Sequence, residues 1–140
     1  MRKSRIAVVL GMTSAAIFIA APGASATIHN LGSFGGGPGY NSSHWDDESY
    51  TQIYFDYCQS NQGAPNKSLV IELREDVAGF PDHSWGSKTF TKCFSSFGSN
   101  GEWTGLNQGG YFFRINKIDD GAGSGFYVYG NSYIDTTKAD

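Results

Sequence analysis

The stretch GEWTGLNQGGYFFRI, residues 101–115, decides the fold class of this chain. Residues 102–106 read as a short strand, residues 107–110 as a tight turn, and residues 111–118 as a second strand. Side chains alternate between the two faces of a strand, so Tyr111 and Phe113 share one face. We therefore predict an antiparallel hairpin, with Trp103, Tyr111 and Phe113 in the hydrophobic core.

The same alternation recurs along the chain. Further strands are predicted at Ser49–Cys58, Ser68–Asp76, Lys88–Phe94 and Gly125–Ile134. Gly-rich turns separate them, and no segment carries the apolar stripe of a surface helix. The pattern predicts an all-β fold, a single antiparallel β-sandwich of six to seven strands. In the first of these segments, the alternation places Tyr57 inside and Cys58 outside.

The N-terminal segment has the pattern of an export signal. Residues 1–26 begin with three basic residues, continue with an apolar run and end with Ala24-Ser25-Ala26. A basic start, an apolar centre and a small-x-small end are typical of a secretory signal peptide. We predict cleavage after Ala26, which makes the mature protein a secreted, extracellular chain of residues 27–140.

The mature chain begins with a glycine-rich segment, residues 27–46. Its centre, Gly35-Gly36-Gly37-Pro38-Gly39, is unsuited to a helix or a central strand. It is either a flexible N-terminal arm or a loop pinned by Phe34 and Tyr40. The β-sandwich domain is then expected to span residues 47–140.

The mature chain is acidic and rich in aromatic residues. Three of the ten basic residues lie in the predicted signal peptide, which leaves seven against 13 acidic residues. Phosphate neutralisation dominates binding to nucleic acid, so this balance argues against a nucleic-acid partner. The only long apolar run lies in the signal peptide, so no membrane insertion is expected. Twenty of the 21 aromatic residues lie in the mature chain, which favours strands and turns.

Cys58 and Cys93 are the only cysteines of the sequence. In an exported protein two cysteines are expected to form a disulfide. A catalytic thiol or a metal pair is the alternative, but a spacing of 35 residues without a CxxC motif disfavours metal binding. Closing a loop of this length stabilises the fold by roughly 3–4 kcal/mol in the chain-entropy model.

The segment from Trp103 to Phe113 resembles a hairpin of prealbumin-like β-sandwiches, including collagen-adhesin B-type repeats. The family pattern is an aromatic residue, Gly-Leu, a Pro/Gly-containing turn and Gly-x-Tyr-x-hydrophobic. The positions here are Trp103, Gly105-Leu106, residues 107–109, Gly110, Tyr111 and Phe113. The resemblance implies a strand–turn–strand unit within a sandwich. The adhesin repeats often carry a Lys–Asn isopeptide bond beside a buried acid. Residues 113–116 contain no acid, so we expect the disulfide to serve as the covalent link instead.

Two histidines have acidic neighbours. His44 precedes Asp46-Asp47-Glu48, which makes it a candidate general base or metal ligand, with a solvated acidic loop as the alternative. His83 lies between Asp82 and Ser84, but Ser-His-Asp triads assemble from distant segments, and the sequence has no GxSxG elbow. We therefore predict no catalytic residue.

Other chemistries leave weaker signals. Glu72, Arg74 and His83 supply the residue types of a small secreted ribonuclease, but no cationic cluster accompanies them. The turn at residues 119–125 begins with two carboxylates but lacks the terminal Glu of a calcium loop. We expect no metal site and no cofactor.

Exposed aromatic residues are the best remaining indication of function. Tyr127, Tyr129 and Tyr133 are predicted on the outer face of the last strand, and a row of aromatic rings can stack on sugars or form a protein contact. The loop from Phe80 to Trp85 offers a second candidate binding surface, at Phe80, His83 and Trp85.

These patterns predict a secreted, non-enzymatic binding module. Its partner would be a cell-surface polysaccharide or an extracellular protein, including an enzyme that it inhibits. The alternatives are a secreted bacteriocin-like or toxin-like effector and, third, a small secreted hydrolase.

Overall fold

The computed structural model describes residues 27–65, 67–95 and 97–137. The predicted signal peptide, residues 1–26, lies outside the described residues. Within the described residues no helix is long and apolar enough to cross a membrane.

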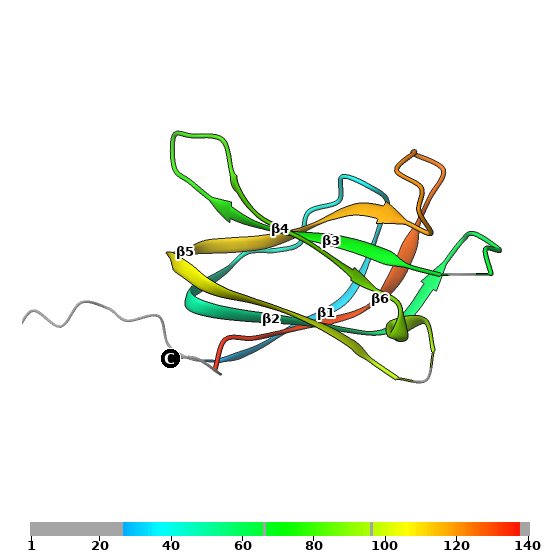
Figure 1. The fold of residues 1–140 in the computed structure, drawn as a ribbon, viewed down its shortest axis with the longest axis horizontal. Helices are drawn as coiled ribbons and strands as arrows, with labels where there is room; N and C mark the ends of the chain where they lie inside the picture. The colour runs from blue at the N-terminus through cyan, green and yellow to red at the C-terminus, as the bar shows by residue number, and fades with distance from the viewer. Residues whose placement is uncertain (1–26, 66, 96, 138–140) are drawn as a thin grey trace, which may run out of the picture.

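Within the described residues, six antiparallel strands form one continuous sheet (Figure 1). In chain order the elements are β1 (Ile28–Gly36), β2 (Trp45–Ser60), β3 (Leu69–Asp76), β4 (His83–Phe90), the short 3-10 turn η1 (Lys92–Phe94), β5 (Ser99–Ile118) and β6 (Val128–Asp135). The strand order in the sheet is β1-β6-β2-β5-β3-β4. The prediction of an all-β, antiparallel fold with six strands and one disulfide is confirmed.

The sheet curls around its own core. Phe55 of β2 and Phe90 of β4 have β5 and β3 between their strands in the sheet, yet their ring centroids lie 4.9 Å apart. The ring centroids of Phe34 of β1 and Phe113 of β5 lie 6.0 Å apart, although β6 and β2 lie between their strands in the sheet. The half formed by β1, β6 and β2 therefore faces the half formed by β3, β4 and the end of β5, so the two layers of the sandwich belong to one sheet.

The predicted core residues of the opening stretch are buried. Trp103, Tyr111 and Phe113 all belong to the central hydrophobic cluster. The Tyr111 hydroxyl donates a hydrogen bond to the Asn107 carbonyl oxygen. Burial, together with the negative charge of nearby carboxylates, raises the pKa of Tyr111 well above its usual value. Tyr111 is thus a neutral core residue, and its hydroxyl bonds to a backbone carbonyl four residues earlier in the chain.

The hairpin predicted at residues 102–118 is wrong, because the chain does not reverse at residues 107–110. β5 runs unbroken from Ser99 to Ile118 and passes from one layer to the other. Its first half pairs with β2 and its second half with β3, and Tyr111 lies opposite both Trp45 and Glu75. Gly105, with a φ of 69°, lies where the register with β2 shifts. The glycines of this segment bend the strand instead of ending it.

The glycine-rich segment 27–46 is held by Phe34 and Tyr40, as one of its two expected forms predicted, but its first part is a strand and not a loop. Residues 28–36 form β1, an edge strand paired with β6, and Phe34 is buried. After the turn that follows, the Gly39 amide donates to the Ile115 carbonyl oxygen over 2.7 Å. An edge strand needs hydrogen bonds on only one side, so pairing with β6 and burial of Phe34 offset the weak strand preference of glycine.

The strand predicted at Lys88–Phe94 is also wrong in its bounds. β4 begins earlier, at His83, and ends at Phe90, and residues 92–94 form η1 instead. The turn directs Cys93 into the core, where its amide donates a 2.8 Å hydrogen bond to the Ser99 hydroxyl. Cys93 is bonded to Cys58 of β2, as predicted. The disulfide therefore attaches η1 to the opposite layer, and such bonds persist in oxidising compartments.

Candidate binding face

The outer surface of β2 and β6 gathers three tyrosines, which we call the tyrosine face: Tyr54, Tyr129 and Tyr133. Tyr54 of β2 lies directly opposite Tyr133 of β6, and their ring centroids are 5.9 Å apart. Tyr129 lies four residues before Tyr133 on the same side of β6, which corresponds to about 13 Å along a strand. The inward neighbours Val128 and Ile134 are fully buried, so the outward rings are not part of the core.

Polar side chains lie between the rings. Asn131, midway between Tyr129 and Tyr133, donates a 3.0 Å hydrogen bond to the Asp56 carboxylate. The Tyr129 hydroxyl donates to the side-chain oxygen of Gln59 over 2.5 Å. These bonds connect β6 to β2 and fix the orientation of the polar groups, which reduces the entropy lost on binding a ligand.

Two glycines make room for tyrosine rings. A side chain at Gly98 would collide with the ring of Tyr54, and one at Gly35 would collide with the ring of Tyr127. The Tyr54 ring thus lies over the backbone just before β5, and the Tyr127 ring lies over β1. Tyr127 is exposed as predicted, but it precedes β6, which begins at Val128 and not at Gly125, so it does not belong to the strand on which the sequence placed it.

Tyr57 is turned outward by a bulge, which corrects the prediction that it faces the core. The register of β2 with β6 shifts between Asp56 and Gln59, and Tyr57 has a φ of 51°. The extra residue reverses the expected alternation, so that Cys58 is buried and Tyr57 is 73% exposed. Alternation along one segment cannot predict such a bulge, because the bulge is defined by the pairing with β6.

The cations and the tyrosine face belong to different parts of the sheet. β1, β2 and β6 contain no Lys or Arg, while β2 and β6 contain five carboxylates. Arg74 and Lys88 belong to the other layer, on β3 and β4, and Arg114 lies in the second half of β5, which pairs with β3. The charged side chains of the strands that carry the tyrosine face are therefore acidic, while Lys92 of η1 is a cation in the cleft beside the face.

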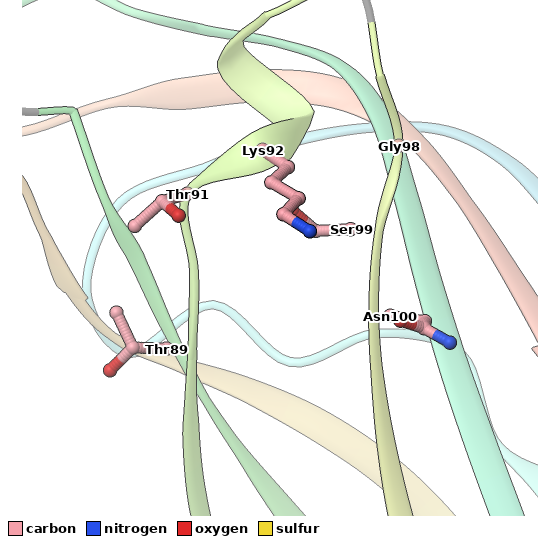
Figure 2. Close-up of a pocket in the computed structure, with 6 residues that line it drawn as sticks. All are labelled: Thr89, Thr91, Lys92, Gly98, Ser99 and Asn100. Atoms are coloured by element: carbon pink, nitrogen blue, oxygen red, sulfur yellow. The ribbon is translucent and has the colours of Figure 1, made fainter.

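An open polar cleft adjoins this face (Figure 2). It separates the end of β4 and η1 from the start of β5, and its lining residues are Thr89, Thr91, Lys92, Gly98, Ser99 and Asn100. The Lys92 side chain points across the cleft toward Ser99. Gly98 also lies under Tyr54, and Asn100 is the partner of Tyr54 in the register with β2. The cleft thus extends the polar border of the tyrosine face.

The second predicted surface, from Phe80 to Trp85, lies on the β3–β4 hairpin, which projects from the rest of the sheet in Figure 1. Phe80 is 74% exposed in the turn. His83 and Trp85 belong to β4, and their rings meet edge to face at 5.3 Å. The Trp85 indole nitrogen donates to Glu75 over 3.0 Å. The structure therefore leaves the Phe80 ring exposed at the tip and keeps Trp85 partly packed against the core.

The candidate acid–base residues have structural partners. His44 Nε2 lies 3.7 Å from Asp76 Oδ2, and its ring packs on Phe112. Glu72 accepts hydrogen bonds from Ser84 and Arg74. Burial acts to raise the pKa of Glu72, but these bonds and the charge of Arg74 outweigh burial and lower the pKa below its usual value. Among the described residues no group of three or more His, Cys, Asp or Glu side chains could hold a metal ion.

Sequence reasoning placed Tyr129 and Tyr133 correctly on the outer side of their strand but did not include Tyr54 and Asp56 among the site residues. A signal for them was present, since alternation in residues 49–58 turns both outward. Their position beside β6 depends on pairing between segments about 75 residues apart, which a local pattern does not contain.

Comparison with protein-family models and with curated proteins finds no match. The resemblance to prealbumin-like domains stays a prediction. The function must therefore be argued from the tyrosine face and its surroundings.

Proposed function

We propose that this chain is a secreted, non-enzymatic binding module whose tyrosine face binds an extracellular polysaccharide. The single observation behind the proposal is the row Tyr54, Tyr133 and Tyr129, with hydrogen-bonded polar groups between the rings. Aromatic rings stack on the apolar faces of sugars, and fixed carboxylate and amide groups bind sugar hydroxyls. The signal-peptide pattern and the disulfide support export.

The exposure of the rings favours binding over packing. Tyr54 is 36% exposed and Tyr129 is 49% exposed, although each is held by a neighbouring residue. Rings that are held but not covered lose little freedom when a ligand binds, which is the advantage of a pre-organised site.

The test is co-sedimentation of the mature, oxidised protein with insoluble cellulose, chitin, chitosan and purified bacterial cell wall. The wild type is expected to pellet with at least one polymer. The triple variant Tyr54→Ser, Tyr129→Ser, Tyr133→Ser is expected to stay in the supernatant. Substitutions of such partly exposed residues cost roughly 0.5 kcal/mol each, about 1.5 kcal/mol for the three, so the melting temperature should fall by less than about 10 °C. A collapse of the melting temperature would identify the tyrosines as structural and contradict the proposal.

A matched control is Phe80→Ser, which removes a more exposed aromatic ring far from the tyrosines in the strand order. This variant should pellet like the wild type.

A protein partner at the β3–β4 hairpin is the second candidate function. The supporting observation is the isolated, exposed ring of Phe80 on a turn braced by Arg74, which donates to the Asp82 carbonyl oxygen over 3.2 Å. Large apolar residues on rigid turns are typical anchors of protein contacts. Failure of the wild type to pellet with any polymer, combined with capture of a culture-supernatant protein that Phe80→Ser abolishes, would favour this candidate.

A further inference from the structure

Asp56 occupies the centre of the tyrosine face. It lies two residues after Tyr54 on the same side of β2 and opposite Asn131, which separates Tyr133 from Tyr129 on β6. The carboxylate therefore has a pair of rings on one side and a third ring on the other. Its Oδ1 accepts the hydrogen bond from Asn131, while Oδ2 accepts none from the described residues.

This grouping suits a positively charged ligand. A carboxylate attracts an ammonium group, and the faces of nearby tyrosines attract it as well through cation–π interactions. The strands β1, β2 and β6 contain no Lys or Arg that could compete for Asp56, and the nearby Lys92 of η1 points across the adjoining cleft toward Ser99. The same charge pattern repels sulfated, phosphorylated or carboxylated polymers.

We propose that the ligand of the tyrosine face is a polysaccharide with free amino groups, and that a sugar ammonium binds Asp56 between the tyrosine rings. This inference rests on the proposed function and names the class of its ligand. The sugar rings would stack on the tyrosines, while the ammonium would use the free carboxylate oxygen. Acetylation of the amino group removes its charge and one of its donors, so a fully acetylated polymer should bind more weakly.

The test compares retention on chitosan, chitin and cellulose, which are polymers of glucosamine, N-acetylglucosamine and glucose. The wild type is expected to bind chitosan most tightly. Asp56→Asn keeps the side-chain shape and an acceptor for Asn131 but removes the charge. It should weaken binding to chitosan roughly tenfold, the effect of losing one charge-assisted contact, and leave binding to the uncharged polymers unchanged.

The net acidity of the chain requires a matched control, because any acidic protein is attracted to a cationic polymer. Asp120→Asn removes the same charge from an exposed turn, at a φ of 63° that Asn tolerates well. This variant should bind chitosan as the wild type does. An equal loss in both variants would mean non-specific attraction and would overturn the inference.

The remaining outcomes separate the inference from the proposed function. Equal binding of chitin and chitosan, with sensitivity to the triple tyrosine variant but not to Asp56→Asn, would overturn the amino-sugar inference and leave the polysaccharide function standing. Failure of the wild type to bind any of these polymers or purified bacterial cell wall would overturn both.

Discussion

Tyr54 owes its position on the tyrosine face to a residue without a side chain. Its ring lies over Gly98, where even a methyl group would collide with it. A methyl group at position 98 would displace the ring toward solvent, and little buried surface would be lost because the ring is already partly exposed. Gly98 therefore determines where the Tyr54 ring lies on the tyrosine face.

Gly98→Ala is thus expected to displace the Tyr54 ring and weaken polysaccharide binding several-fold, while the free energy of unfolding changes by about 1 kcal/mol or less. Co-sedimentation and urea unfolding measure the two effects. Gly63→Ala is the matched control, since no neighbouring atom lies within 4 Å of the added carbon, and it should leave binding unchanged. Undiminished binding by Gly98→Ala would show that the observed position of Tyr54 does not matter.

The sequence and the structure differ most at single residues that carry a bulge. Alternation correctly placed Tyr54, Tyr129 and Tyr133 on outer faces, because each lies in a regular part of its strand. It failed at Tyr57 and Cys58, where one extra residue in β2 exchanges inside and outside. The disulfide and its buried partner Cys93 hold Cys58 inward, and that constraint comes from a segment 35 residues away.

At the scale of elements, β5 shows why a turn-like sequence need not be a turn. Asn-Gln-Gly-Gly at residues 107–110 has the composition of a hairpin loop, yet it lies where β5 leaves β2 and joins β3. Flexible residues can form either a hairpin loop or a bend within a strand. Which of the two forms depends on the partner strands that are available. The edge strand β1 is a second example. Its glycines disfavour a strand, but pairing with β6 supplies the backbone hydrogen bonds that hold it in the sheet.

The 3-10 turn η1 depends on its covalent attachment to β2. We expect the double variant Cys58→Ala, Cys93→Ala to lower the free energy of unfolding by about 3–4 kcal/mol, because the disulfide closes a loop of 35 residues. Urea unfolding of the oxidised wild type and the variant measures the difference. Reduction of the wild type should reproduce the effect, and identical unfolding midpoints would contradict it.

At the scale of the whole molecule, one curled sheet presents two chemically different outer surfaces. The β1-β6-β2 half carries tyrosines and carboxylates, while Arg74 and Arg114 lie on strands of the other half. The all-β class, the disulfide and the tyrosines of the last strand could be predicted from the sequence. The curl of the sheet could not, because it results from β2 and β5 pairing over long, bulged registers. Assembly of the tyrosine face is a consequence of that pairing.

The location of bound sugar on the protein tests the polysaccharide-binding tyrosine face most directly. Amide signals of the isotope-labelled, oxidised protein would be followed by nuclear magnetic resonance while soluble glucosamine or N-acetylglucosamine oligomers are added. We expect shifts confined to residues 52–59 and 127–135 and their neighbours on β1 and at the start of β5. Shifts centred on residues 77–85, or no shift with either oligomer, would contradict a polysaccharide-binding tyrosine face.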